Sequence, residues 1–410
     1  MNINTKFDRK QYEELLAKAT NTLMEKRIED DNRAKECIEK IVLEEAKDLP
    51  IDNIIFLINR IFGRLRGDIG SLSYLSDLNV NEIMVNGFDT IFIEVDSHIE
   101  KVDDCFDSTE ELEHVIRRIA ASVHREINEF KPILDARLED GSRVNAVMKN
   151  IAIGGPSLSI RKFGNNKISL DEMVNGGGLS AECADDIRTM VRGGLNIFVS
   201  GGTSSGKTTL LNAISDYIPE SERVIVIEDS LELKLNNIAN IVRLECRNAN
   251  SAGKGAINMA DLIRSSLRMR PDRIVVGEVR GGEVLDMLQA LNTGHCGFST
   301  GHGNSSCGML RRIEAMYLSA VEIPVDAIRM QICEAIDILI HMERLPSGRR
   351  KIIEVNELTG YRDGEYVLNP LYELSDDMSL VRTDNLLSDD IKLRLRGIND
   401  TGLQRVQAKQ

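Results

Sequence analysis

The stretch GGTSSGKTT, residues Gly201–Thr209, decides the fold of this chain. Its glycines, lysine and threonine have the spacing G-x-x-x-x-G-K-[ST] of a phosphate-binding loop. The glycines let backbone N–H groups turn toward phosphates, the lysine reaches the β and γ oxygens, and the threonine hydroxyl holds Mg²⁺. We therefore predict that ATP or GTP is bound by Gly201, Gly202, Thr203, Ser204, Ser205, Gly206, Lys207, Thr208 and Thr209.

The residues on either side of the loop have the pattern that the motif requires. Residues 196–200 (NIFVS) are typical of a short buried strand, and residues 209–218 (TLLNAISDYI) predict a helix that leaves the loop. The start of that helix adds a partial positive charge beneath the phosphates. This context favours a nucleotide site over a glycine-rich turn that binds nothing.

Length and composition limit the class of protein. A chain of 410 residues is expected to form two or three domains. Its net charge of −14 argues against stable nucleic-acid binding, because neutralising phosphates needs a basic surface. We see no secretory signal and no apolar run long enough to span a bilayer, so we expect a cytoplasmic protein. The seven cysteines include no C-x-x-C pair, and we expect free thiols.

Changes of pattern along the chain predict five segments. A helical N-terminal bundle is followed by an α+β amino domain, in which short strands flank an amphipathic helix that begins after Ser108. A stretch rich in Gly and Asn then predicts a linker and hinge, and the alternating strands and helices beyond it predict a mostly parallel α/β sheet. The polar end of the chain is expected to be peripheral. In order, these segments are residues 1–66, 67–162, 163–178, 179–375 and 376–410.

Two apolar strands after the loop end in carboxylates. Residues 273–278 (RIVVGE) place Glu278 where a P-loop enzyme puts an acid beside Mg²⁺ and the attacking water, so Glu278 is the candidate general base. Residues 224–229 (VIVIED) bring Glu228 and Asp229 to the same sheet edge if the strands are parallel neighbours. Either of these two carboxylates could share the metal's water shell or cap the following turn.

Histidine and arginine side chains are the remaining candidates. His302 lies in TGHCGFSTGHGNSS among small polar residues and could sense the γ-phosphate by hydrogen bonding. Cleavage of a triphosphate builds up negative charge that a cation must stabilise. Arg143 and Arg161 lie at strand positions before the predicted hinge and are suited to this task, as is Arg270, which precedes the Glu278 strand.

Taken together, these motifs resemble the secretion ATPase superfamily of type II and type IV secretion, conjugation and pilus assembly (GspE/PulE-like). The resemblance rests on GGTSSGKTT, VIVIEDSLEL, LRMRPDRIVVGEVRGGE and TGHCGFSTGHGNS, which match the Walker A, Asp, Walker B and His boxes. The upstream run PILDARLEDGSRVNAV with GPSLSIRKF looks like the amino domain of the CpaF branch, the motor of Flp/Tad-type pili. The match covers roughly residues 67–345 in order.

The resemblance implies a RecA-like ATPase domain in a ring, usually a hexamer, in which ATP sits between two domains and hydrolysis rocks them about the linker. It implies that Glu278 is the Walker B base, that Glu228 belongs to the Asp box and His302 to the His box, and that Arg143 and Arg161 reach the phosphates. It also implies a polytopic inner-membrane platform as partner, at the inner face of the cell membrane.

Two departures from the family pattern are visible. The four-cysteine zinc module of many type II secretion motors is absent, and the His box reads GHGNS instead of GHANS, with Gly303 beside His302. Four functions remain open on the sequence: a pilus-assembly motor, a conjugation-like translocation ATPase for protein or DNA, a nucleotide switch such as a GTPase, and a scaffold that binds ATP without hydrolysing it.

Overall fold

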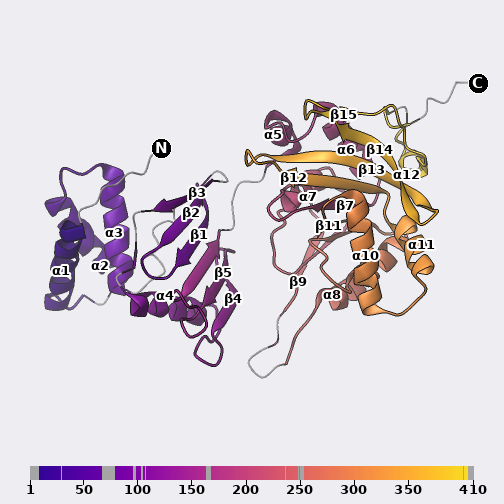
Figure 1. Ribbon diagram of the computed structural model, residues 1–410. Coiled ribbons are helices and arrows are strands. Elements are labelled where there is room, and N and C mark those ends of the chain that lie inside the picture. Colours follow the sequence, from indigo (N-terminus) through magenta and orange to yellow (C-terminus); the bar gives the residue numbers. More distant parts are fainter. Residues whose placement is uncertain are drawn as a thin grey trace, which may run out of the picture. The chain divides into compact units, whose positions relative to one another are not determined.

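The computed structural model (Figure 1) describes residues 9–28, 30–66, 79–95, 98–102, 105–106, 108–162, 168–235, 237–247, 249, 254–399 and 401–404. The chain forms two compact units, Met1–Asn165 and Asn166–Gln410. The predicted start of the amino domain at residue 67, and the first five residues of the predicted linker, lie outside the described residues.

The first unit begins with three helices, α1 (Arg9–Glu25), α2 (Asp31–Glu45) and α3 (Ile51–Arg66). The Asp30 side chain caps α2 by accepting a hydrogen bond from the Arg33 N–H at 2.9 Å. Apolar residues at helical spacing meet in a small core, among them Leu15, Ile38 and Leu57. The predicted helical bundle is confirmed.

A six-stranded antiparallel sheet and one helix complete the first unit. The strand order is β3-β2-β1-β6-β5-β4. Helix α4 begins after Ser108, as predicted, and packs on alternate strand residues such as Val144 and Ile160. The intervening residues, Arg143 and Arg161 among them, therefore belong to the opposite face. The elements are β1 (Val80–Asn86), β2 (Ile91–Val95), β3 (His98–Val102), α4 (Thr109–Ser122), β4 (Ile133–Arg137), β5 (Arg143–Val147) and β6 (Ser157–Arg161).

The second unit is built on a nine-stranded sheet with the order β15-β14-β13-β12-β7-β11-β10-β8-β9. The strands from β12 to β9 run parallel, and β13 to β15 add an antiparallel extension. The predicted mostly parallel sheet is confirmed. The strands are β7 (Ile197–Gly201), β8 (Val224–Glu228), β9 (Ile241–Glu245), β10 (Arg273–Val276), β11 (Cys296–His302), β12 (Ile338–Arg344), β13 (Arg350–Arg362), β14 (Glu365–Leu374) and β15 (Leu380–Arg382).

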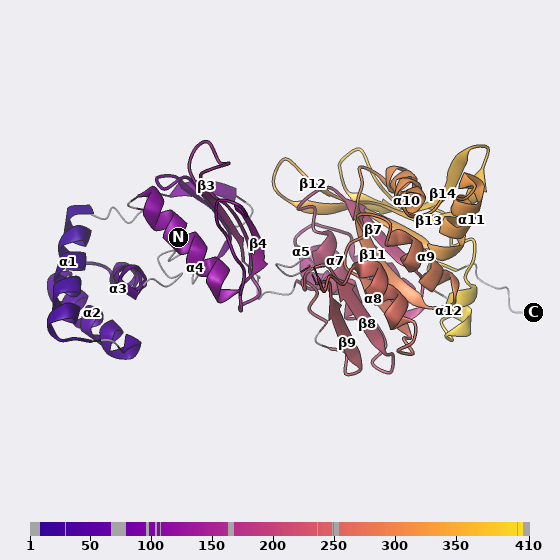
Figure 2. The same cartoon turned by 90° about the horizontal axis from the view of Figure 1, so that it is seen from below.

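Helices cover both faces of this sheet (Figure 2), because its central strands are apolar on both sides. One apolar layer includes α5 (Leu170–Asn175), α6 (Ala181–Arg192), α7 (Lys207–Ser215) and α12 (Ile391–Leu395). The other includes α8 (Met259–Ser266), α9 (Val284–Asn292), α10 (Ser306–Ala320) and α11 (Val325–Ala335). This is the layered α/β architecture of a RecA-like domain.

The segment predicted as a linker differs from that expectation. Helix α5 is fixed by a capping box between Ser169 and Glu172, and the Leu170 side chain is fully buried in the core of the second unit. The Gly178 carbonyl accepts a hydrogen bond from the Ile352 N–H at 2.8 Å, which joins the end of this segment to β13. Residues 168–178 therefore belong to the second unit, because local capping and one buried leucine outweigh their glycine-rich composition.

The segment predicted as a peripheral tail also packs against the second unit. Leu387, Leu393 and Leu403 are buried in the same core as α6 and α7. Arg382 lies 3.3 Å from Asp186 of α6, and Lys392 pairs with Asp337. Three spaced leucines in a polar stretch were a weak sequence signal, yet they anchor residues 380–399 and 401–404. Residues 400 and 405–410 lie outside the described residues.

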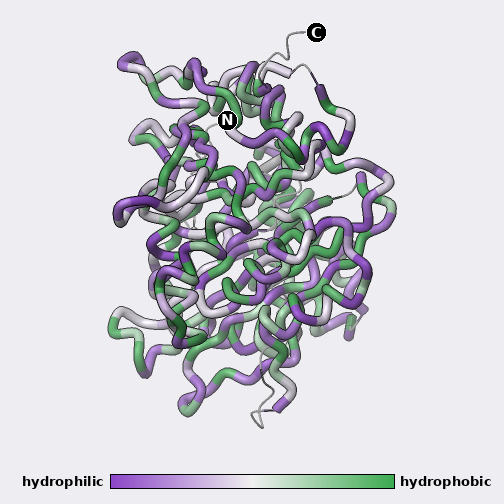
Figure 3. The backbone as a smooth tube through the Cα atoms, turned by 90° about the vertical axis from the view of Figure 1, so that its right-hand side faces the viewer, coloured by the Kyte–Doolittle hydropathy of each residue, from purple (hydrophilic) through white to green (hydrophobic). Residues whose placement is uncertain are grey.

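Hydrophobic and hydrophilic residues are mixed along the coloured part of the backbone (Figure 3). Within the described ranges, no helix combines the length and the apolar character that crossing a membrane requires.

Candidate functional site

The phosphate-loop motif joins β7 to α7 as predicted. Gly206 adopts φ +98°, a left-handed conformation that glycine takes without strain, and it serves as the N-cap of α7 without any side-chain cap. The first N–H groups of a helix have no partner within the helix. The start of α7 thus presents backbone donors and the positive end of the helix dipole, a combination that binds anions.

Arg350, the first residue of β13, supports this loop and was missed at the sequence level. Its Nε donates to the Ser204 carbonyl at 3.1 Å, and its Cδ lies 3.1 Å from where a Cβ on Gly206 would be. Arg350 lies 144 residues after Gly206 in the sequence (350 − 206), and the pairing of β13 with β12 brings it to the phosphate loop. No local motif marks such a residue.

The Lys207 ammonium is held close to the loop itself. It donates to the Gly201 carbonyl at 3.1 Å and the Gly202 carbonyl at 2.8 Å, and its Nζ lies 3.3 Å from Nδ1 of His302. The residue is only 7% exposed, so its charge is stabilised by these oxygens rather than by bulk water. The lysine is in position to exchange these contacts for phosphate oxygens.

His302 connects Lys207 to Glu278. Strands β7, β11 and β10 are parallel neighbours, so the ends of all three reach the same sheet edge. His302 Nε2 lies 2.8 Å from Glu278 Oε1. Because the lysine can only donate, Nδ1 must accept, and the ring proton of a neutral His302 therefore lies on Nε2. Among the described residues, however, no group donates a hydrogen bond to the buried Glu278 Oε1, so the 2.8 Å contact is a close approach rather than a hydrogen bond. Burial lowers the pKa of His302, and the nearby Lys207 charge adds to this effect while Glu278 opposes it.

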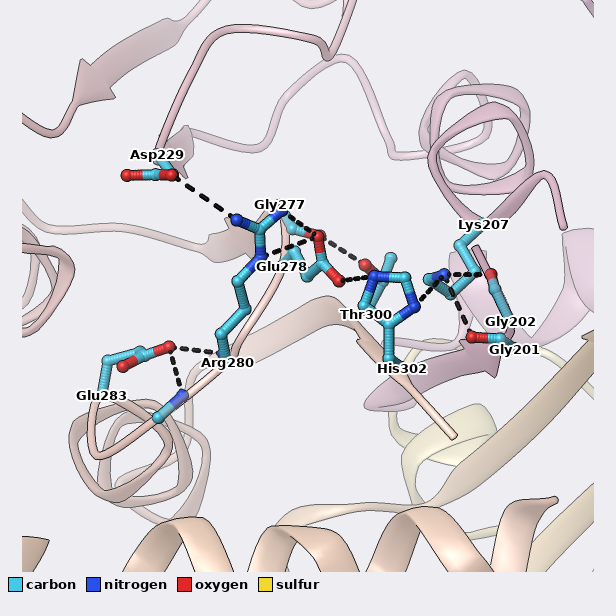
Figure 4. A network of polar contacts seen from close by, with 11 residues as sticks. Gly201, Gly202, Lys207, Asp229, Gly277, Glu278, Arg280, Glu283, Thr300 and His302 are labelled. Carbon is cyan, nitrogen blue, oxygen red and sulfur yellow. Dashed lines mark hydrogen bonds and ion pairs between the residues drawn. The ribbon is translucent and has the colours of Figure 1, made fainter. Parts of the chain in front are cut away.

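Arg280 holds the other oxygen of Glu278. Its Nη2 and Nε lie 2.8 Å and 3.2 Å from Glu278 Oε2, and its Nη1 lies 3.8 Å from Asp229 Oδ2. Figure 4 shows the resulting line of contacts from Lys207 through His302, Glu278 and Arg280 to Asp229. Sequence reasoning passed over Arg280, although it stands only two residues after the candidate base.

The backbone around Glu278 is fixed by both neighbouring strands. The Gly277 N–H donates to the Ile227 carbonyl at 2.9 Å, and the Val279 N–H donates to the Thr300 carbonyl at 2.9 Å. The Thr300 hydroxyl in turn donates to the Gly277 carbonyl at 2.7 Å. The backbone of the candidate base is therefore fixed by hydrogen bonds to neighbouring strands, unlike that of a residue in a free loop.

Glu228, at the end of the buried strand β8, caps the turn that follows it. Its Oε1 accepts the N–H groups of Glu232 at 2.8 Å and Leu233 at 3.0 Å. Gly277 on the neighbouring strand leaves room for this side chain, because a Cβ there would lie 3.0 Å from Glu228 Cγ. Of the two roles open on the sequence, this structure displays the capping role.

A cavity of about 320 Å³ lies beside Glu278. Its lining includes Glu278, Arg280, Asp229 and Glu283, together with Cys246 and Arg247. The Glu278–Arg280 pair thus borders an open space whose lining does not include His302.

The predicted arginines of the amino domain lie side by side in the first unit. Arg143 on β5 is directly opposite Arg161 on β6, and on its other side it is opposite Arg137 on β4. Residues directly opposite each other share a face, so three arginines follow one another across the sheet. Arg137, which sequence reasoning did not select, also donates from Nε to the Gly141 carbonyl at 3.1 Å in the β4–β5 turn.

Arg270 lies at the edge of its own sheet opposite to the one that carries Glu278. It precedes β10, whereas Glu278 follows it, and four strand residues at about 3.3 Å each separate the two edges by roughly 13 Å. The exposed Arg270 side chain is therefore not part of the Lys207–Glu278 cluster of its own chain. Arg270 was predicted because it is close in sequence to the strand of Glu278, but closeness in sequence does not tell which end of that strand a residue flanks.

Comparisons with known proteins agree with this arrangement. A family model described as Type II/IV secretion system protein matches residues 66–363. The probable conjugal transfer protein TrbB of Sinorhizobium fredii (strain NBRC 101917 / NGR234) is 34% identical over 297 residues, covering 71% of this chain and 87% of that protein. The type IV secretion system protein PtlH of Bordetella pertussis (strain Tohama I / ATCC BAA-589 / NCTC 13251) is 34% identical over 267 residues, covering 58% and 78%.

A likeness of fold is found in the crystal structure of the pilus retraction motor PilT with bound ADP. It has a TM-score of 0.51 and 20% identity and covers 80% of this chain and 86% of that one. The predicted resemblance to the secretion ATPase superfamily is confirmed, while the CpaF branch stays a prediction. By sequence, this chain belongs to the family of type II/IV secretion system proteins.

Proposed function

We propose that this chain is a cytoplasmic motor ATPase, acting as a homohexamer at the inner face of the cell membrane, that powers assembly of a Tad/Flp-type type IV pilus or a related secretion system. The observation that carries the proposal is the meeting of Lys207, His302 and Glu278 at one sheet edge, with contacts of 3.3 Å and 2.8 Å. A phosphate-binding lysine and a strand-end carboxylate linked by one imidazole are suited to cleaving a nucleoside triphosphate.

The loop fits a triphosphate and Mg²⁺. The uncapped start of α7 supplies backbone donors, and the loop glycines allow close approach to them. Residues Gly201–Thr209 would hold the phosphates, with the Thr208 hydroxyl and Glu278 on the metal side. Bound Mg²⁺ would neutralise charge that develops on the phosphates during cleavage.

Each of the remaining site residues has a separate role in ATP hydrolysis. The Lys207 ammonium leaves its carbonyl partners for phosphate oxygens, and the Glu278 carboxylate takes the proton of the attacking water. His302 lies on the phosphate-loop side of Glu278, with its Nε2 2.8 Å from Oε1. Arg143 and Arg161 of the amino domain supply positive charge when the two domains close, with Glu228 holding the turn next to β10.

The domain organisation follows from the same proposal. An amino domain that begins near residue 67 and an ATPase domain separated by residues 163–167 would move against each other, since α5 onward packs with the ATPase core. The hinge is thus proposed to be shorter than residues 163–178.

Steady-state turnover of ATP and GTP tests the chemistry. Lys207→Ala should weaken nucleotide binding, and Glu278→Gln should preserve binding but lower kcat by about 10²-fold or more, because a carboxamide cannot accept the proton. The exposed carboxylate of Glu322 provides a matched control as Glu322→Gln, which should retain wild-type turnover. Unchanged turnover in both site variants would contradict the catalytic assignment. Wild-type protein that binds ATP without turnover would indicate a scaffold, and a strong preference for GTP would indicate a switch.

The second candidate, a translocation ATPase for protein or DNA, is favoured by the names of the relatives, which are conjugal transfer and type IV secretion proteins. The two candidates share their chemistry and differ in the membrane partner. Affinity capture from native membranes distinguishes them: a polytopic pilus platform supports the first, and a coupling protein with channel subunits supports the second.

A further inference from the structure

Arg280 makes the most specific contact with the candidate base. Two of its nitrogens, Nη2 and Nε, converge on the same Glu278 oxygen, Oε2, at 2.8 Å and 3.2 Å. Glu278 Oε1 lies on the other side, 2.8 Å from His302 Nε2, and accepts no hydrogen bond from the described residues. The carboxylate thus lies between an imidazole and a guanidinium, which Figure 4 shows on opposite sides of it, and only the guanidinium holds it by hydrogen bonds.

Arg280 is itself anchored. Its backbone N–H and that of Gly281 both donate to Glu283 Oε1, just before α9 begins. Its Nη1 lies 3.8 Å from Asp229, at the end of β8. An arginine guanidinium is charged at any working pH, and hydrogen bonding to Glu278 raises the pKa of Arg280 further.

This contact is poorly placed for a purely structural role. The Arg280 side chain is 56% exposed and borders the cavity beside Glu278, and exposed ion pairs contribute little to stability. Without Arg280, Oε2 would have no charged partner among its described neighbours to fix it, and the carboxylate could rotate about its terminal torsion. Rotation would carry Oε1 away from the His302 and Lys207 side.

We infer that Arg280 is a positioning residue for ATP hydrolysis: it holds Oε2 of Glu278 so that Oε1 faces the phosphate loop. Asp229 acts one step further away by steadying the guanidinium. This inference rests on the proposed function, because it needs Glu278 to be the base. It also assigns Asp229, the second carboxylate of VIVIED, a role that does not involve the metal.

Arg280→Ala, Arg280→Lys and wild type are compared as full-length protein. For Arg280→Ala we expect kcat to fall by about 10- to 100-fold, as for small misplacements of catalytic groups, with the Kd of a fluorescent ATP analogue unchanged within about twofold. Arg280→Lys should recover part of the loss, since it keeps the charge without the two-nitrogen contact. Guanidinium ion, which can enter the open cavity, should restore part of the rate of Arg280→Ala.

The matched control is Arg264→Ala. Arg264 is similarly exposed and pairs with the carboxylates of Asp261 and Asp286, but it contacts none of the residues between Lys207 and Asp229 in Figure 4. It should retain wild-type kcat. Thermal unfolding of each variant shows whether any loss of rate comes from misfolding.

The inference is overturned if Arg280→Ala keeps a kcat within about threefold of wild type, if its loss lies in nucleotide Kd, or if neither lysine nor guanidinium recovers activity. Failure of the proposed function gives a different result. In that case wild-type protein itself shows no turnover above Glu278→Gln, and the inference falls with it.

Discussion

Replacing Glu222 with alanine should destabilise the second unit strongly while leaving the chemistry at Glu278 intact. Glu222 neutralises Arg273, the first residue of β10, whose side chain is completely buried. The Arg273 Nε and Nη2 donate to the carboxylate at 2.8 Å and 3.3 Å, and Nη2 also donates to the Val191 carbonyl at 3.0 Å. The guanidinium lies 5.0 Å from the Phe298 ring centroid.

The expected loss of stability follows from the buried Arg273 charge that Glu222→Ala would leave without its carboxylate. Removing one partner of a buried pair leaves an uncompensated charge in the core, which costs about 3–5 kcal/mol. For a domain of 150–250 residues, 1 kcal/mol lowers Tm by about 2–4 °C, so a decrease of roughly 6–20 °C is expected. Arg396 of the C-terminal segment also binds Glu222, but its side chain is 34% exposed, and Arg396→Ala should cost less than about 1 kcal/mol.

Calorimetry or guanidinium unfolding of the three proteins measures these differences. A double variant, Glu222→Leu with Arg273→Met, removes both buried charges and should recover most of the lost stability, since apolar pairs replace buried ion pairs at little cost. The reasoning is refuted if Glu222→Ala unfolds within 1 °C of wild type, or if the double variant is no more stable than the single one. Turnover per folded molecule should stay unchanged, because β10 separates Arg273 from Glu278.

Two further predictions concern the phosphate loop and its histidine. Burial lowers the pKa of His302 below its ordinary value of 6.5, and Lys207, Arg280 and Arg312 add to this effect while Glu278 opposes it. The folded protein therefore binds this proton less readily than the unfolded chain does. The contribution of neutral His302 to the free energy of unfolding is complete above pH 6.5 and is lost as the pH falls below that value. A protonated ring cannot accept from Lys207, so kcat measured from pH 5 to 8 should fall on the acid side, and an identical acid limb in His302→Asn would contradict this role. Gly206→Ala should lower stability by about 1–2 kcal/mol, because alanine is strained at φ +98°; chemical denaturation would show this loss against Gly202→Ala, whose Cβ meets nothing within 4 Å and which should unfold like wild type.

The elements of the second unit could be predicted because their signals are local. An apolar run of strand length, the G-x-x-x-x-G-K-[ST] spacing and a carboxylate at a strand end each occupy a few consecutive residues. Parallel pairing of β7, β11 and β10 then brings Lys207, His302 and Glu278 together without any further information. Alternation of strands and helices predicted a mostly parallel sheet, whereas the order β7-β11-β10 is known only from the structure.

Predictions from average composition were wrong for two segments in which a few buried residues determine the structure. The glycine-rich stretch before residue 178 holds a capped helix with Leu170 buried, and the polar C-terminal segment is fixed by three leucines and by Arg396 on Glu222. Burial of single side chains depends on partners from distant segments, and those partners are not visible in a local window. The same limit applies to Arg350, which reaches the loop only through the pairing of β12 with β13.

Arg270 and Arg280 show how strand direction decides between two equally plausible arginines. Both flank the same short strand, and each could supply a cation to a cleaved phosphate. A parallel sheet binds ligands at the carboxyl ends of its strands, so only the arginine after the strand can meet Glu278. The side chain that follows β10 forms the two-nitrogen contact with the candidate base, whereas the one that precedes it lies at the opposite edge. Sequence reasoning weighed the residue type and its distance along the chain, but the direction of β10 determines which charge lies at the site.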